Sequence, residues 1–306
     1  MPLDPQVAEL REQRIAAGAP PLYTQSLADA RAADLADIQA AGGSPEPVHS
    51  VVDREIAGPG GTLPLRIYRP QGEAPLPTLV YFFGGGWVLG SIETSDAICR
   101  RLANAVPCQV ITVGYRLAPE HPFPAAVQDC EAAVRWIAAH ATELGVGPLA
   151  VGGDSAGGNL AAVVAQLCAG QLAGQLLVYP NTLYGSDTAS MRENDDPALF
   201  NHRSVAWYWG HYLESVADGK DPRVSPLLAD DLTGLPPALV ITAEFDPLRD
   251  EGEAYAARLR DAGVPVTQTR YDGMVHGFFA MSGILDGGRR AVDQAARWLD
   301  DVFREH

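Results

Sequence analysis

Short, almost continuous apolar runs recur along this chain, and they limit its fold more than any other feature. The runs lack the alternation of apolar and polar residues that marks a strand with one face in water, so we expect strands that are covered on both faces. Strands of this kind are typical of a mostly parallel sheet. The runs lie at residues 78–83, 109–115, 148–153, 175–180 and 238–243.

Segments with helical spacing lie between or after these runs. Apolar residues recur about every three or four positions in 127–137, 160–167 and 292–303. Strand–helix alternation of this kind predicts an α/β fold in which helices cover both faces of the sheet. Upstream, residues 52–57 and 63–70 are separated by the sequence GPGG and predict an antiparallel hairpin that leads into the sheet.

Two regions interrupt this alternation and predict the domain organisation. Residues 1–45 are rich in alanine with helical periodicity, and residues 181–225 are rich in aromatic side chains, which argue against disorder. A long excursion from a compact sheet is usually functional, so we interpret 1–45 as an N-terminal helical cap segment and 181–225 as a cap insertion over a pocket. The simpler alternative is a helical appendage on the surface. Residues 46–180 and 226–306 then form the two parts of one α/β domain.

Charge and composition exclude several classes of protein. The formal net charge is −16, whereas nucleic-acid binding needs clustered Lys and Arg. The N-terminus lacks a basic region followed by an apolar run, and no stretch of about 18 apolar residues occurs. We therefore predict a cytoplasmic protein that binds neither nucleic acid nor membrane. The four cysteines show no CxxC pair and no spacing suited to zinc, so we predict reduced core thiols and no metal.

The motif G-x-S-x-G occurs at residues 153–157, between a predicted strand and a predicted helix. It follows the apolar run PLAVG and precedes the helical segment NLAAVVAQLCAG. This strand–turn–helix setting places a serine hydroxyl on a sharp turn above a sheet, and the glycines allow the two backbones to approach closely. We predict that Ser155 is a nucleophile rather than a helix-capping serine.

A serine nucleophile needs a base, and the base needs an acid that orients it. Among the seven histidines, His276 follows a predicted last strand and has a glycine beside it. Asp246 follows the run ALVITAEF, at the carboxyl end of a strand, where the sites of open α/β sheets gather. Glu244 is too close to the strand body, and Asp250 is expected to face outward from the next helix. The chain order Ser155, Asp246, His276 is the order expected of an α/β-hydrolase.

The stretch LVYFFGGGW at residues 79–87 ends a predicted strand with three glycines. Each glycine weakens a strand by about 0.5–1 kcal/mol, so three successive glycines require a structural or functional explanation. Either the chain only turns here, or its bare amides face a ligand.

Together these residues resemble the hormone-sensitive-lipase-like family of α/β-hydrolase carboxylesterases. The motifs that carry the resemblance are GGGW at 84–87, YRLAPEHPFPAA at 115–126, GDSAGGNL at 153–160, DPLRDEG at 246–252 and VHGF at 275–278. The resemblance implies an α/β-hydrolase fold with a helical cap. It implies hydrolysis of short- to medium-chain carboxylic esters without a metal or organic cofactor, and it suggests a homodimer.

The resemblance also assigns roles by position. Ser155 attacks the ester carbonyl, His276 is general base and then general acid, and Asp246 orients His276. The backbone N–H groups of Gly85, Gly86 and Ala156 form the oxyanion hole. Two further acidic residues, Asp154 and Glu120, are expected to support loops.

One position departs from the family pattern. The family typically has a histidine before the glycines, where this chain has Phe83. Our hypothesis is that packing by Phe82, Phe83 and Trp87 replaces that polar anchor and leaves an apolar pocket wall. We expect Phe83, Trp87 and Trp207 to line the substrate pocket.

Two alternatives stay open at this point. A catalytically altered hydrolase-fold protein could bind a small molecule without cleaving it, or it could act as a carbon–oxygen lyase. Loss of the serine or the histidine would favour the binder, and both are present. Thioester, lactone and amide hydrolysis would use the same residues as ester hydrolysis.

Overall fold

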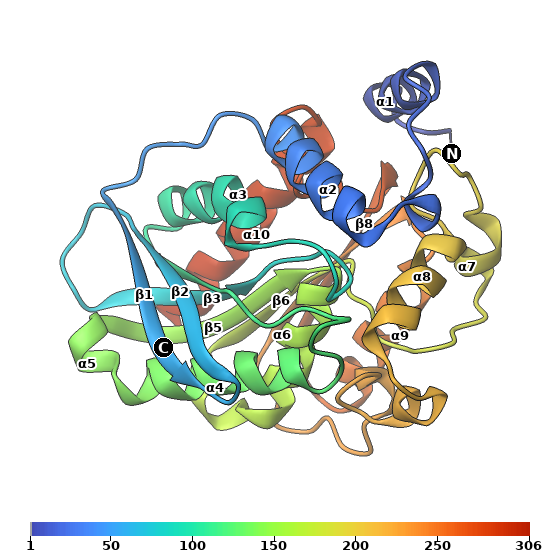
Figure 1. Cartoon of the computed structure of the whole chain (residues 1–306). Coiled ribbons are helices and arrows are strands. Elements are labelled where there is room, and N and C mark those ends of the chain that lie inside the picture. The colour runs from blue at the N-terminus through green and yellow to red at the C-terminus, as the bar shows by residue number, and fades with distance from the viewer. Residues whose placement is uncertain (1) are drawn as a thin grey trace.

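The computed structural model describes residues 2–306 and is built around an eight-stranded sheet. The strand order is β1-β2-β4-β3-β5-β6-β7-β8; the strands from β4 to β8 are parallel, and β1 and β2 are antiparallel to their neighbours. Figure 1 shows the twisted sheet in the middle of the molecule. The strands are β1 (Ser50–Gly58), β2 (Gly61–Arg69), β3 (Leu76–Phe82), β4 (Gln109–Val113), β5 (Val146–Asp154), β6 (Gly174–Val178), β7 (Ala238–Phe245) and β8 (Val266–Val275).

The burial of the strands explains the apolar runs. Every residue of β4 and β6 is buried, as expected for strands with both faces covered. The predicted hairpin is also confirmed, because β1 and β2 pair from Ser50 opposite Arg69 to Gly58 opposite Gly61. The prediction of a mostly parallel sheet with an antiparallel entry is therefore correct.

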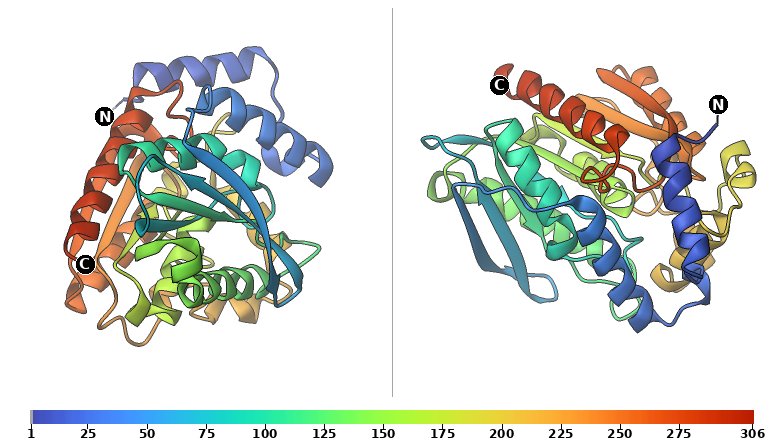
Figure 2. Two further views of the ribbon diagram at one scale, coloured as in Figure 1. Left: turned by 90° about the vertical axis from the view of Figure 1, so that its left-hand side faces the viewer. Right: turned by 90° about the horizontal axis from the view of Figure 1, so that it is seen from above.

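Helices cover both faces of the sheet, as Figures 1 and 2 show. On one face α3 (Ile92–Ala105) and α10 (Asp286–Arg304) pack on side chains such as Leu79 and Ile241. On the other face α4 (Ala125–Ala139), α6 (Ala156–Leu167) and α9 (Arg249–Asp261) pack on the alternate side chains, such as Val80 and Val240. Short helical segments α5 (Ala141–Leu144) and η2 (Ala169–Gln171) connect β5 and β6 to their neighbours.

Two helical regions lie outside this layered core. The first contains α1 (Pro5–Ala16), η1 (Leu22–Thr24) and α2 (Leu27–Gly42). The second lies between β6 and β7 and contains α7 (Ala189–Glu193), α8 (His202–Tyr212), η3 (Val216–Lys220) and η4 (Pro226–Leu228). The two regions meet, because η1 contacts α8, and the left view of Figure 2 shows α1 and α2 above the sheet.

The four cysteines are free and buried, which confirms the prediction of reduced core thiols. Among residues 2–306, no helix is both long and apolar enough to cross a membrane.

Candidate active site

Ser155 lies on the sharp turn that the sequence motif predicts. It directly follows β5 and precedes α6, and its backbone φ of 55° and ψ of −120° are strained for a residue with a side chain. The flanking glycines permit this turn. A Cβ atom on Gly157 would lie 2.0 Å from the carbonyl oxygen of Phe82, and one on Gly153 would lie 2.4 Å from the same atom.

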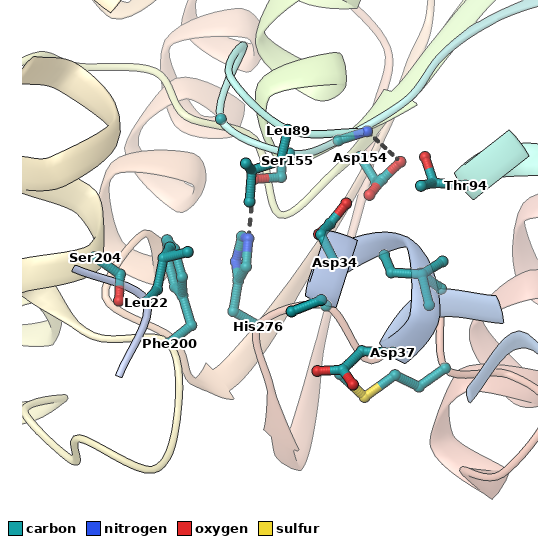
Figure 3. Close-up of a pocket in the computed structure, with 18 of the residues that line it drawn as sticks. Leu22, Asp34, Asp37, Leu89, Thr94, Asp154, Ser155, Phe200, Ser204 and His276 are labelled. Atoms are coloured by element: carbon teal, nitrogen blue, oxygen red, sulfur yellow. Dashed lines mark hydrogen bonds between the residues drawn. The ribbon is translucent and has the colours of Figure 1, made fainter. Parts of the chain in front are cut away.

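A continuous line of hydrogen bonds joins Ser155 to His276 and Asp246 (Figure 3 shows the first of them). The Nε2 atom of His276 lies 2.9 Å from Ser155 Oγ, and its Nδ1 atom lies 2.8 Å from Asp246 Oδ2. Asp246 is fully buried, and its other carboxylate oxygen accepts a hydrogen bond from the N–H of Leu248 at 2.8 Å. The three residues follow β5, β7 and β8, so the shared direction of parallel strands brings them together.

Aromatic rings fix the position of the imidazole. Phe200, from the segment before α8, stacks on His276 with 4.1 Å between ring centroids, and the ring of Tyr179 lies 4.6 Å away on a tilted plane. The side chain of His276 is only 10% exposed. The histidine is therefore held toward Ser155 and shielded from bulk water.

The glycine stretch forms a tight loop after β3. Gly85 and Gly86 have φ values of 113° and 59°, which side chains rarely tolerate. The ring of Tyr208 occupies the space beside Gly86, where an added Cβ atom would lie 2.1 Å from it. Both glycines line the same cavity as Ser155. Ala156 begins α6, so its backbone N–H has no acceptor within the helix.

Polar contacts as well as packing hold this loop. The buried Asp154 accepts hydrogen bonds from the hydroxyl of Tyr81 at 2.7 Å and from the N–H of Gly84 at 3.2 Å. The hydroxyl of Tyr115 donates to the carbonyl oxygen of Phe83 at 2.8 Å. Burial raises the pKa of Asp154, while its hydrogen bond from Tyr81 opposes that shift.

A cavity of about 280 Å³ opens above Ser155 and His276. It is bounded below by the glycine loop and above by both helical regions outside the sheet. Its apolar lining includes Leu22, Ile38, Phe83, Leu199, Phe200 and Met281.

Two of the predicted pocket residues need correction. Phe83 lines the cavity, but Trp87 and Trp207 do not. Trp87 has a φ of 62° and is turned into the core, where it stacks on Tyr212 with 4.3 Å between centroids. Trp207 lies on α8 and packs against His211 instead.

Glu244 and Asp250, which were rejected as the acid of the triad, form hydrogen bonds away from His276. Glu244 accepts a hydrogen bond from the N–H of Gly273 at 2.8 Å. Asp250 does not simply face outward, because it accepts from the N–H of Ser190 and pairs with Arg249 at 2.8 Å.

Sequence reasoning missed several residues of the cavity. Phe200 and Tyr208 belong to the aromatic segment that signalled a cap, but their positions beside His276 and Gly86 depend on how α8 packs. Asp34, on α2, also lines the cavity, and no motif around it gave a signal. Within residues 2–306, no cluster of three His, Cys, Asp or Glu side chains is suited to a metal ion.

Comparisons with known proteins agree with this geometry. A family model described as the alpha/beta hydrolase fold matches residues 79–280. The chain is 45% identical to the carboxylic ester hydrolase LipN of Mycobacterium tuberculosis over 81% of this chain and 70% of the relative. It is 41% identical to an arylesterase of Saccharolobus solfataricus over 85% and 86% of the two chains. The solved structure of an esterase from Pyrobaculum calidifontis superposes with a TM-score of 0.93 at 43% identity, covering 98% of this chain and 99% of the other.

Proposed function

The chain belongs to the α/β-hydrolase fold family, and from that premise we propose that it is a serine carboxylesterase that cleaves short- to medium-chain esters. The observation that carries the proposal is the hydrogen-bonded line from Ser155 through His276 to Asp246 at the floor of a cavity. The related esterases support the choice of esters as substrates.

In the first step Ser155 Oγ attacks the ester carbonyl carbon. His276 Nε2 lies 2.9 Å from Oγ and takes up its proton as the new C–O bond forms. Asp246 holds the opposite ring nitrogen, so it fixes the tautomer that accepts a proton at Nε2 and stabilises the imidazolium. The proton then passes to the leaving alcohol, and an acyl-enzyme remains on Ser155.

The carbonyl oxygen becomes negative in the tetrahedral intermediate. We assign its stabilisation to the backbone N–H groups of Gly85, Gly86 and Ala156, which lie in the glycine loop and at the start of α6. Removing one such donor typically costs about 10²–10³ in kcat, so the anchoring of the loop by Asp154 and Tyr115 matters for rate.

In the second step a water molecule attacks the acyl-enzyme. His276 removes a proton from the water and returns it to Ser155 as the acid leaves, so the enzyme is regenerated with no other reactant. The buried position of His276 under Phe200 supports this role, because it keeps the base close to the reacting atoms.

The test of this mechanism uses p-nitrophenyl butyrate with the wild type and Ser155→Ala. We expect the variant to lose activity by about 10³-fold or more, because the nucleophile is absent. A fluorophosphonate probe should label the wild type at Ser155 and leave the variant unlabelled. Ser44→Ala, a change at an exposed position outside the helices and strands, is the matched control and should keep its labelling.

This test also separates the alternatives. A small-molecule binder would hydrolyse no ester in either form. A carbon–oxygen lyase would form an alkene in place of an alcohol, and because the aryl group of p-nitrophenyl butyrate does not permit this elimination, it would release no p-nitrophenol. Equal hydrolysis by wild type and Ser155→Ala would contradict the nucleophile. Cytoplasmic location and a homodimer remain predictions from the sequence and from the family resemblance.

A further inference from the structure

Helix α2 contributes a carboxyl group to the cavity that holds Ser155 and His276. Asp34 lines this cavity, and Figure 3 shows its carboxyl group pointing from α2 toward the side on which Ser155 and Asp154 lie. Asp34 has no part in the steps of ester cleavage described above. Because Asp34 lines the cavity, its charge acts on whatever substrate the cavity binds.

The surroundings of Asp34 do not compensate its charge. Burial, together with the neighbouring carboxylates of Asp154 and Asp37, raises the pKa of Asp34 to about 7, while the N–H of Gly90 acts in the opposite direction. Tyr208 of α8 lines the same cavity, and burial and then the charge of Asp34 raise the pKa of its hydroxyl. In the described part of the chain, Asp34 forms no ion pair with a cationic side chain.

The cationic groups of the cavity are already engaged. Arg14 binds Asp37 at 3.1 Å and donates to the carbonyl oxygen of Ala198 at 3.2 Å. Both ring nitrogens of His276 bind other partners of the active site, Ser155 and Asp246. A partly buried carboxylate without a counter-ion is unfavourable, and a cation that enters with the substrate would relieve this.

We propose that Asp34 is a specificity-determining residue that makes the cavity prefer esters carrying a protonated amine over neutral esters of the same shape. This inference rests on the proposed esterase function. The ammonium group pairs with the carboxylate of Asp34 while the ester carbonyl lies over Ser155. An ester bearing a carboxylate is disfavoured at the same place, because it adds a further negative charge beside Asp34, Asp37 and Asp154.

The experiment compares two pairs of esters that differ only in charge. The first pair carries the amine on the alcohol side: 2-(dimethylamino)ethyl butyrate against 3-methylbutyl butyrate. The second pair carries it on the acyl side: methyl 4-(dimethylamino)butyrate against methyl 5-methylhexanoate. For each pair the ratio of kcat/KM for the cationic ester to kcat/KM for the neutral ester is measured at pH 8 by titration of the released acid.

We expect this ratio to fall about tenfold or more in Asp34→Asn for at least one pair, which is the size of effect that a close charge pair gives. The matched control is Asp29→Asn on the same helix. Asp29 is exposed and does not line the cavity, so its ratio should change by less than about threefold.

The pH dependence provides a second measurement that needs no variant. Because the pKa of Asp34 is about 7, the wild-type ratio should fall as the pH is lowered from 8 to 6 and the carboxylate is neutralised. The amines stay largely protonated up to pH 8, and any loss of the proton near pH 8 lowers the ratio there, opposite to the expected change. Effects of pH on the shared catalytic residues cancel, because both esters of a pair use the same residues. In Asp34→Asn the ratio should not change with pH.

The outcomes are distinguishable. Equal ratios in the wild type and Asp34→Asn for both pairs, with neutral esters still cleaved, would overturn this inference and leave the esterase function intact. A fall in the ratio for Asp29→Asn alone would overturn it as well. Failure of the folded wild type to cleave any of the four esters would overturn the proposed function and this inference with it. If Asp34→Asn does not fold, a wild-type ratio that is constant from pH 6 to 8 decides against the inference.

Discussion

Phe83 stands where the family resemblance predicts a histidine, and its surroundings explain how the glycine loop keeps its shape. Its side chain is 2% exposed and stacks on Tyr115 with 4.3 Å between ring centroids. The same tyrosine donates a hydrogen bond to the carbonyl oxygen of Phe83, and Asp154 holds the next residue, Gly84. The hypothesis that packing anchors the loop is therefore incomplete, since hydrogen bonds to the backbone contribute too.

This arrangement predicts that Phe83→His will not improve the enzyme. A histidine would lose the stack on Tyr115 and would bury a polar ring that needs a partner, which costs about 1–3 kcal/mol. We expect a lower Tm and kcat for p-nitrophenyl butyrate that is unchanged or reduced. An increase in kcat of more than about tenfold would contradict the view that the present contacts hold the loop equally well.

Glu251 is a second residue whose environment is unusual. It is 1% exposed, and its Oε1 atom accepts hydrogen bonds from the N–H groups of Thr182 and Leu183 at 2.8 and 3.2 Å. The hydroxyl of Ser186 also acts on this carboxyl group and favours its ionised form. Burial raises the pKa of Glu251 to about 8, so the neutral carboxyl is the favoured form in the folded protein at neutral pH.

This pKa predicts a pH-dependent loss of stability. Because the folded pKa lies above the unfolded value of 4.5, the contribution of Glu251 is fully present below that value and is lost as the pH rises through about 8. In Glu251→Gln the side chain stays neutral. The variant should therefore gain Tm relative to the wild type between pH 6 and pH 8.5.

The measurement is thermal unfolding across this pH range. Glu305→Gln, at the exposed end of α10, is the control and should show a constant difference from the wild type. A difference between Glu251→Gln and the wild type that does not change with pH would contradict the assignment.

At the scale of elements, Arg31 connects α2 to the segment that follows the glycine loop. Its guanidinium donates to the carbonyl oxygens of Val88 and Ala118, both at 3.0 Å. It also binds both carboxylate oxygens of Glu120 at 2.7 Å. Glu120 was expected to support a loop, and its partner turns out to come from the N-terminal region. The position of α2 over the cavity is thus coupled to the loop that carries Gly85 and Gly86.

Arg31→Ala should consequently impair catalysis from outside the cavity. The change leaves two carbonyl groups without their donor and loosens α2, so we expect kcat/KM for p-nitrophenyl butyrate to fall about tenfold and the free energy of unfolding to fall by about 1–3 kcal/mol. Arg31→Lys keeps the charge but not the planar fork, and it should restore activity only in part.

An exposed arginine provides the control for this prediction. Arg304→Ala removes a surface pair with Asp300 on α10 and should change stability by less than about 1 kcal/mol and leave kcat/KM unaltered. Full activity of Arg31→Ala would mean that α2 is held in place by its apolar contacts alone.

At the scale of the whole molecule, the cavity lies between the sheet and two helical regions that are far apart in the sequence. Its volume of about 280 Å³ and its lining by Leu22, Phe200 and Met281 suit a compact apolar acyl chain. The regions that close it, α1 to α2 and α7 to η4, leave limited room for a long chain.

The enzyme should therefore discriminate by chain length. With p-nitrophenyl esters, we expect the highest kcat/KM for butyrate to octanoate and a steep fall from dodecanoate onward, because longer chains must leave the cavity. Hydrolysis of palmitate as efficient as that of butyrate would show that the helical regions move aside to admit long chains.

Much of the fold followed from the sequence because its signals are local. Apolar runs without alternation predicted strands with both faces covered, and the burial of β4 and β6 confirms this. The cavity lining did not follow in the same way. Trp87 was expected in the pocket, but its backbone turns the side chain into the core beside Tyr212. The order of residues in the sequence does not specify which way a loop side chain points.

By itself the sequence determined the α/β architecture, the turn at Ser155 and the choice of Asp246 and His276, because parallel strands deliver the residues at their carboxyl ends to one edge of the sheet. Only the tertiary structure decided what surrounds them. Asp34 reaches the cavity from α2, Tyr208 from α8 and Phe200 from the segment before α8. Contacts between such distant segments depend on long-range burial rather than on any local pattern of residues.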